Sequence, residues 1–291
     1  MHIAMHIGAH CTGSDLVVRS LRRNLDRISP LGIAVPETET YHAPLRDAVN
    51  GLRGAPMPPG AEDALLDSIL RGTQADRLIL SNTSFLCVPD RALEGGALYP
   101  LIHKARWLRD LFPSHEVSFH LCLRDMATFL PALFRAQRRH AEFGRFLDGA
   151  DLAALRWSEP VRELLDTCPD CTLSFWCYED SPLIWEEVMR SVGGIPGDVA
   201  LHGMYDMAAQ VMERSGMARL RAYVDKRPPR STGLRQKVTA AFIDAFAIEE
   251  ALHEDRPTPA WDADLCDRLT RIYETDLAEI VAMDRVTAIT R

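Results

Sequence analysis

Residues 1–21, MHIAMHIGAHCTGSDLVVRSL, contain the pattern that decides the fold: a strand, a glycine-bounded loop and a helix. Ile3, Met5 and Ile7 alternate as the residues of a strand do, and from Leu16 onward the apolar residues follow helical spacing. The loop between the two elements covers residues 8–15. Such a loop leaves backbone N–H groups unpaired at the positive end of the helix dipole, where they can bind a phosphate.

Strand patterns recur as far as residue 180 and alternate with helical patterns. After the first strand, the expected strands are residues 32–37, 77–81, 116–125 and 172–180. Helical patterns occupy residues 97–112, 126–147 and 158–167. Strands that alternate with helices form parallel βαβ units. We therefore expect an α/β fold, a parallel sheet with helices on both faces.

The pattern changes after Gly194. Residues 204–224, 235–253 and 262–282 have helical spacing, and we expect no strand among them. No long flexible linker separates this part from the rest. We expect a single domain over residues 1–291, with an α/β core (1–200) and a helical C-terminal section (201–291).

The composition limits the possible functions. A net charge of −8 argues against broad attraction to nucleic acid but leaves room for a local basic patch. No apolar run is long enough for a membrane span, and the first residues lack the pattern of a secretory signal. The seven cysteines follow no disulfide framework, which is typical of a reducing cytoplasm, the expected location.

One pair of cysteines, in Cys168-Pro-Asp-Cys171, has redox or zinc spacing. A zinc site needs a second pair of ligands, and no second pair with clear spacing accompanies this one. We favour an incidental turn and expect no metal cofactor. A redox or metal role remains the alternative.

Polar residues follow the expected strands at their carboxyl ends, where open α/β sheets bind ligands. They lie in the loop 8–15 and in residues 81–84, 124–125 and 178–180. In an ordinary P-loop a lysine and a Ser or Thr follow the second glycine, whereas here Ser14 and Asp15 follow Gly13. The loop therefore disfavours a kinase or an NTPase that uses a magnesium nucleotide.

A different family matches better. HIGAHCTGSDLVVRSLRRNLDRISPLGIAVP (residues 6–36) resembles the opening of PAPS-dependent sulfotransferases, particularly bacterial sulfotransferase-like proteins, with Asn24, Gly32 and Pro36 in matching places. Residues 117–140, which include Arg124, are similar to the 3′-phosphate segment of the family. Residues 176–194 and 271–283 resemble its later strand and its terminal helix. The resemblance implies a P-loop-like fold and PAPS (3′-phosphoadenosine 5′-phosphosulfate) as the cofactor.

The resemblance also implies the roles of individual residues. The 5′-phosphate is expected against the loop, at Gly8, Ala9, His10, Cys11, Thr12, Gly13 and Ser14. Arg124 and Arg230, the latter in the basic run 226–237, are the implied contacts of the 3′-phosphate. His42 or Glu37 is the implied general base for a hydroxyl of a small-molecule or carbohydrate acceptor. The alternatives are an ion pair of Arg124 with Asp125 or Glu179, and a solvated helix start for the basic run.

The loop departs from the pattern of the family. Cys11 stands where the family has a lysine, and Ala132 where it has a serine. A thiol supplies no fixed positive charge, and Asp15 stabilises a helix start but repels a phosphate. His10 replaces the missing cation if it is protonated. The other reading, slightly favoured, packs His10 against the neighbouring strand.

Three hypotheses follow. The first is an enzyme that transfers a sulfo group from PAPS to a hydroxyl acceptor. The second is a catalytically inactive protein that keeps the fold and serves as a ligand-binding or partner protein, which accounts for Cys11, Asp15 and Ala132 together. The third is a nucleotide or sugar kinase, which needs a metal and a cationic loop residue.

Overall fold

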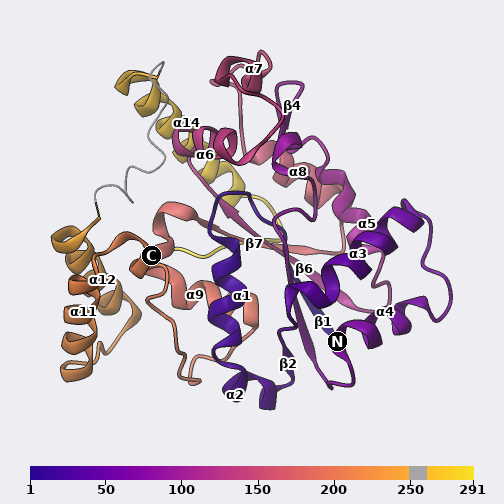
Figure 1. Cartoon of the computed structure of the whole chain (residues 1–291), viewed down its shortest axis with the longest axis horizontal. Coiled ribbons are helices and arrows are strands. Elements are labelled where there is room, and N and C mark those ends of the chain that lie inside the picture. The colour runs from indigo at the N-terminus through magenta and orange to yellow at the C-terminus, as the bar shows by residue number, and fades with distance from the viewer. Residues whose placement is uncertain (249–260) are drawn as a thin grey trace.

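The computed structural model describes residues 1–248 and 261–291, and its centre is a six-stranded sheet in the order β2-β3-β1-β6-β7-β8 (Figure 1). Every neighbouring pair in this sheet is parallel. The strands are β1 (His2–His6), β2 (Ile33–Ala34), β3 (Arg77–Ser81), β6 (Glu116–Leu123), β7 (Thr172–Cys177) and β8 (Val286–Ala288). The expected α/β fold with a parallel sheet is confirmed.

Helices cover both faces of the sheet because its strands are apolar on both faces. Ile3, Met5 and Ile7 of the first strand segment belong to one buried cluster, and Ala4 belongs to the other. The second cluster lies under α1 (Ser14–Arg22) and α9 (Ser181–Gly193). The first lies under α3 (Thr38–Leu52), α4 (Ala61–Leu70), α5 (Ala105–Arg109), α6 (Met126–Ala136), α8 (Ser158–Thr167) and α14 (Ala263–Val281). Full burial of each large apolar side chain stabilises the fold by roughly 1.5–3 kcal/mol.

Two expected helices are shorter than the sequence pattern predicted. Residues 97–112 begin with a hairpin strand, because Gly95 and Gly96 have φ of 62° and 76° and turn the chain back on itself. The hairpin pairs β4 (Leu93–Glu94) with β5 (Ala97–Leu98), and only α5 of the expected segment is an α-helix. Residues 126–147 divide into α6 and α7 (Phe143–Leu147). The chain becomes extended at Gln137, whose side-chain amide donates to the carbonyls of Phe134 and His140.

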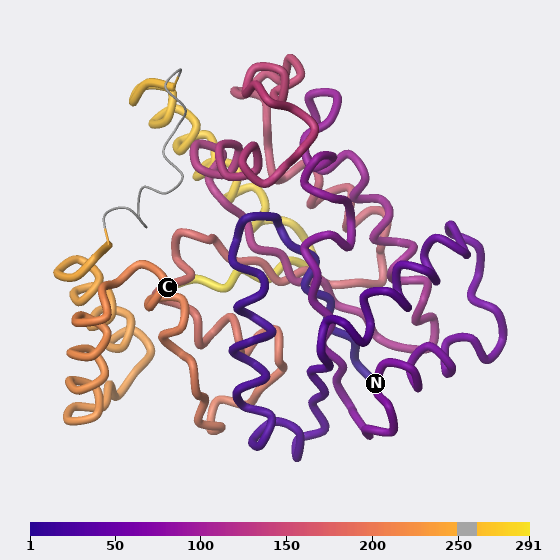
Figure 2. The backbone as a smooth tube through the Cα atoms, viewed as in Figure 1, coloured from indigo at the N-terminus to yellow at the C-terminus, as the bar shows by residue number. Residues whose placement is uncertain are grey.

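The C-terminal section is helical, with one addition that the sequence analysis missed. It contains α10 (Ala208–Val211), α11 (Arg214–Lys226), α12 (Thr232–Phe246) and α14. The tube in Figure 2 shows α11 and α12 as an orange hairpin at the periphery of the molecule, where α12 packs against α9. The expected helix 235–253 ends at Phe246, and residues 249–253 lie outside the described ranges. After α14, the three residues Val286–Ala288 form β8, which pairs with β7 through Leu173 and Val286. A strand of three residues is too short for alternation to reveal it.

The remaining short elements connect these parts. They are α2 (Leu25–Ile28) and the 3-10 turns η1 (Ser29–Leu31), η2 (Pro89–Arg91), η3 (Ile102–Lys104) and η4 (Tyr178–Asp180). Across residues 1–248 and 261–291, no helix has both the length and the apolar character needed to cross a bilayer.

Candidate functional site

The loop 8–13 joins β1 to α1 and is held against the neighbouring strand β6. Ala9 N–H donates to the carbonyl of Cys122 over 3.0 Å, and Cys122 N–H donates to the carbonyl of Gly8 over 2.8 Å. The Thr12 hydroxyl donates to the carbonyl of Ala9 over 2.7 Å. These bonds extend the pairing of the sheet into the loop and fix its path. The loop is therefore a rigid entry to α1 at the carboxyl ends of the strands.

The φ angles of the loop alternate in sign, as they do in anion-binding nests. Cys11 and Gly13 have left-handed φ of 57° and 72°, Thr12 between them has a negative φ, and helical Ser14 follows. Such alternation turns successive N–H groups toward one hollow. Within the described residues, no hydrogen bond occupies the N–H of Gly13, Ser14 or Asp15. These donors lie at the positive end of the α1 dipole, where an anion binds most favourably.

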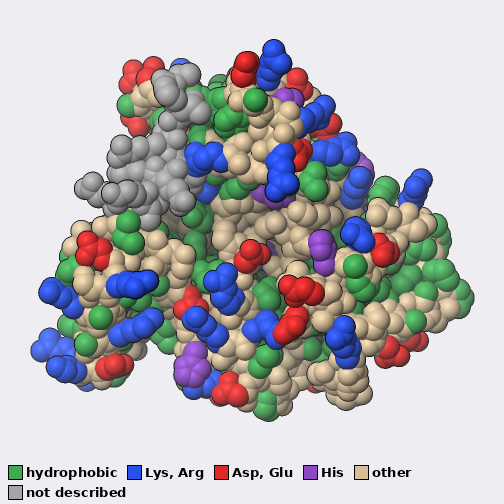
Figure 3. Space-filling view, viewed as in Figure 1, with side chains coloured by type: hydrophobic (Ala, Val, Ile, Leu, Met, Phe, Trp, Pro, Cys, Tyr) green, Lys and Arg blue, Asp and Glu red, His purple; other side chains and the backbone are tan. Residues whose placement is uncertain are grey.

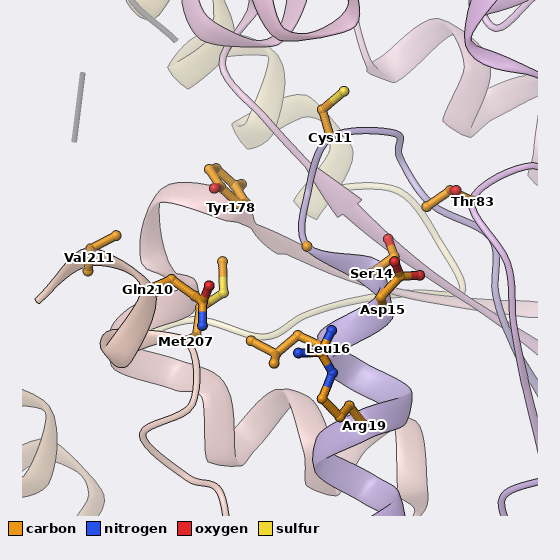
Figure 4. Close-up of a pocket in the computed structure, with 11 residues that line it drawn as sticks. Cys11, Ser14, Asp15, Leu16, Arg19, Thr83, Tyr178, Met207, Gln210 and Val211 are labelled. Carbon is orange, nitrogen blue, oxygen red and sulfur yellow. The ribbon is translucent and has the colours of Figure 1, made fainter. Parts of the chain in front are cut away.

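A cavity of about 440 Å³ opens between this loop, the first turns of α1 and α10 (Figure 4). Its lining consists of Cys11, Gly13, Ser14, Asp15, Leu16, Arg19, Thr83, Tyr178, Met207, Gln210 and Val211. Arg19 is the one Lys or Arg among these lining residues, and Figure 4 shows its guanidinium turned toward the start of α1. The sequence analysis did not select Arg19, although its position one turn after Asp15 on the same helix indicates a shared face.

Asp15 does not close the cavity. Its side chain is exposed, and no N–H group of the described loop donates to it. The carboxylate nevertheless belongs to the lining, so it adds a negative charge beside the N–H groups. Asp15 and Arg19 therefore act in opposite directions on a bound anion.

Arg124 joins the loop to a second cavity. Its guanidinium donates to the carbonyl of Cys11 over 2.6 Å and to the Thr128 hydroxyl over 3.0 Å, and it lies 4.3 Å from the centre of the Tyr178 ring. The second cavity measures about 530 Å³ and is lined in part by Arg124 and Arg291. It shares Tyr178, Met207 and Val211 with the first cavity. The two hollows are therefore adjacent, and Arg124 holds the loop on the boundary between them.

Glu179 lines the second cavity. The sequence analysis included it among the strand-end residues expected at the ligand edge and as a possible ion-pair partner of Arg124, but assigned it no catalytic role. It accepts from Asp125 N–H over 2.9 Å and from the Tyr273 hydroxyl over 3.3 Å. Loss of hydration at the carboxylate, together with the nearby Asp125, raises the pKa of Glu179 to about 7. A carboxyl group that titrates near neutral pH in a cavity can exchange protons with a ligand.

His10 lies in the core and lines neither cavity. The Tyr99 hydroxyl accepts from His10 N–H over 2.8 Å and is 2.7 Å from Nδ1 of the same residue, and the two rings stack at 5.7 Å. Burial lowers the pKa of His10 to about 4, so the ring is neutral near pH 7. At that pH the neutral ring of His10 does not supply the positive charge that the loop lacks. Its environment is that of a histidine packed in the core, which was the slightly favoured alternative.

The two residues at the expected positions of the family motif are both uncharged: Cys11 is half-buried and lines the first cavity, and Ala132 lies in the core. Burial raises the pKa of the Cys11 thiol to about 11, so it carries no charge that would help or oppose an anion at neutral pH. Ala132 is buried on α6. Neither side chain replaces the lysine or the serine of the family.

The two candidate bases lie near the start of α3 and outside both cavities. Glu37 pairs with Arg22 at 2.8 Å, and its side chain is 62% exposed. His42 is exposed, whereas its neighbour Tyr41 turns inward and donates to the carbonyl of Ser81 over 2.8 Å. The structure brings neither candidate base to the loop.

Residues of the basic run have two different environments. Arg230 is exposed in the turn between α11 and α12 and lines neither cavity. Arg235 is buried, and its guanidinium pairs with Glu186 at 3.1 Å and with Glu187. The run therefore contributes one structural ion-pair cluster and a set of exposed cations, and the structure does not fold it over the loop.

The strand-end residues and the cysteine pair also have definite places. Thr83 lines the first cavity, whereas Ser81 is buried and its hydroxyl lies 2.8 Å from Nδ1 of His6. Cys168 and Cys171 form a buried turn in which Cys171 N–H donates to the carbonyl of Cys168. The part of the chain that the structure describes contains no group of His, Cys, Asp and Glu arranged to hold a metal ion.

The comparisons with known proteins add no relatives. No protein-family model matches the sequence, and no curated protein is similar to it at a significant level.

Proposed function

We propose that this chain is a sulfotransferase-like protein that binds PAPS, or its desulfated product PAP, at the loop 8–14 and transfers a sulfo group to a hydroxyl of a small molecule or carbohydrate. The observation that carries the proposal is the nest of unpaired N–H groups facing a cavity, with Arg19 on the same lining. The resemblance of the sequence to PAPS-dependent sulfotransferases supports the choice of anion. A cytoplasmic location is part of this proposal, since the seven cysteines follow no disulfide framework.

The residues at the site fit the two phosphate ends of the cofactor unequally. The N–H groups of Gly13, Ser14 and Asp15 and the guanidinium of Arg19 suit the 5′-phosphate. Arg124 lines the adjacent cavity and is the proposed contact of the 3′-phosphate, although it already donates to the carbonyl of Cys11. The combined volume of the two cavities falls in the size range of binding sites for small molecules. The proposal does not use His10 or Arg230, whose side chains lie outside both cavities.

Calorimetry with PAP tests the binding step. We expect wild type to bind PAP and not adenosine, and Arg19→Gln to weaken binding by roughly ten- to a hundredfold, because a charge-assisted hydrogen bond to phosphate contributes roughly 1.5–3 kcal/mol. Arg71→Gln removes an exposed arginine outside the cavities and is the matched control. Absence of PAP binding at millimolar concentration, or equal losses in both variants, contradicts the proposal.

A second candidate function is ligand binding without transfer. It is favoured by the neutral Cys11 thiol and by the positions of Glu37 and His42 outside the cavities. The double variant Cys11→Lys/Asp15→Asn separates the two functions. Sulfo transfer by the double variant together with an inactive wild type supports the non-catalytic protein. Transfer by wild type rejects it.

A further inference from the structure

The α11/α12 hairpin carries a charge of opposite sign to the rest of the chain. Residues 213–244 contain eight Lys or Arg and three acidic residues, a net charge of +5 in a chain of −8. Figure 3 shows Lys and Arg side chains gathered over this hairpin, on the side of the molecule that carries the orange helices in Figure 1. Seven of the eight are exposed: Arg214, Arg219, Arg221, Lys226, Arg227, Arg230 and Lys237.

Residues 1–248 and 261–291 provide no ion-pair partner for these seven cations. By contrast, Arg22 and Arg23 on α1 pair with Glu37 and Asp206. Arg219 lies over the ring of Phe246 at 5.1 Å and Arg227 over the ring of Tyr223 at 5.8 Å, contacts that orient a guanidinium without cancelling its charge. The hairpin therefore presents an open field of positive charge.

The tip of the hairpin adds exposed apolar side chains to this charge. Tyr223 near the end of α11 is 37% exposed, and Leu234 near the start of α12 is 46% exposed. Both lie close to the turn 227–231, where Lys226, Arg227 and Arg230 are exposed. Amphipathic segments with Lys and Arg around exposed aromatic and aliphatic residues bind the interface of anionic membranes.

The hairpin is fixed to the body of the protein, so its tip is presented in one orientation. Arg235 pairs with Glu186 and Glu187 on α9, and Met212, Met217 and Leu220 form a small buried cluster beneath α11. Residues 223–234 contain one acidic residue, Asp225, against the three exposed cations Lys226, Arg227 and Arg230. Salt at physiological strength screens charges beyond about 8 Å, so acidic residues farther away weaken the attraction at the tip little.

We propose that the tip of the α11/α12 hairpin docks on an anionic phospholipid surface. The cations contact lipid phosphates, and Tyr223 and Leu234 enter the interface. Nucleic acid is the other polyanion that such cations attract, but its phosphates offer no apolar layer for Leu234. This proposal is independent of PAPS binding.

Co-sedimentation of the full chain with vesicles tests the docking. We expect binding to vesicles that contain about 30% phosphatidylglycerol and not to pure phosphatidylcholine, with about a fivefold loss per removed cation. The variant Lys226→Gln/Arg227→Gln/Arg230→Gln should therefore bind about a hundredfold more weakly. Arg71→Gln/Arg268→Gln/Arg271→Gln changes net charge equally at exposed positions elsewhere and should bind as wild type does.

Tyr223→Ser/Leu234→Ser tests the apolar part, and thermal unfolding of each variant checks that it folds. We expect this variant to keep the salt dependence of binding but to bind more weakly at every salt concentration. Equal losses in the tip and control triple variants, or tighter binding to an oligonucleotide duplex than to anionic vesicles, would overturn the proposal.

Discussion

Stability below neutral pH should depend strongly on His10, and the size of the effect follows from its burial. The ordinary pKa of a histidine is 6.5, and burial lowers that of His10 to about 4. As the pH falls below 6.5, His10 binds a proton in the unfolded chain but stays neutral in the folded chain. The free energy of unfolding therefore decreases. The loss is about 1.4 kcal/mol per pH unit and reaches about 3 kcal/mol near pH 4, where the folded state also protonates.

The variant His10→Asn isolates this contribution, because its side-chain oxygen can accept from the Tyr99 hydroxyl in place of Nδ1. Urea denaturation at pH 7, 6.5, 6, 5.5 and 5, in a buffer without phosphate or sulfate, measures both proteins. His6, whose pKa burial also lowers to about 4, contributes equally to both. We expect the stability difference between wild type and variant to shift by about 1.5 kcal/mol against wild type between pH 6.5 and pH 5. Parallel curves, or wild type gaining stability as the pH falls, would refute the argument and restore His10 as a candidate cation.

Three further substitutions have expected outcomes. Asp15→Asn should tighten PAP binding by about fivefold or more in calorimetry, because a carboxylate near the phosphate costs about 1 kcal/mol at a wet surface; unchanged affinity would place the anion elsewhere. Arg235→Gln should lower the free energy of unfolding in urea by about 3 kcal/mol, since Glu186 and Glu187 lose their partner; a loss below 1 kcal/mol contradicts this. Asp276→Ala should lower the free energy of unfolding in urea by roughly 1–3 kcal/mol, because Asp276 accepts hydrogen bonds from the buried N–H groups of Trp157 and Ser158. Equal stability of wild type and variant would disprove that role.

The sequence predicted the strands of the sheet better than its shorter elements. Strands such as Arg77–Ser81 and Glu116–Leu123 are long and apolar enough for their pattern to be visible. Val286–Ala288 has only three residues, and its place in the sheet depends on pairing with Leu173, which is remote in sequence. Gly95-Gly96 is itself a signal for a two-residue hairpin turn, but the strands on either side have two residues each and are too short to show alternation.

Side chains at the site were harder to predict than the loop itself. The presence of the loop could be predicted from the order of a strand, a glycine-bounded turn and a helix. Gly13 has a left-handed φ, a conformation that glycine adopts readily. The spacing of Arg19 from Asp15 places both on one face of the helix, but exposed arginines on helices are common, and the cavity is what distinguishes Arg19 from them. His10 lies next to the loop in sequence but turns toward Tyr99, and nothing in the local sequence tells which side of the loop it faces.

Backbone amide chemical shifts during a PAP titration test the central claim most directly, because the claim concerns the N–H groups of Gly13, Ser14 and Asp15. We predict that these three amide signals shift downfield on addition of PAP and stay in place on addition of adenosine. The account is contradicted if PAP leaves all three signals unmoved, whether it binds at another surface or does not bind at all.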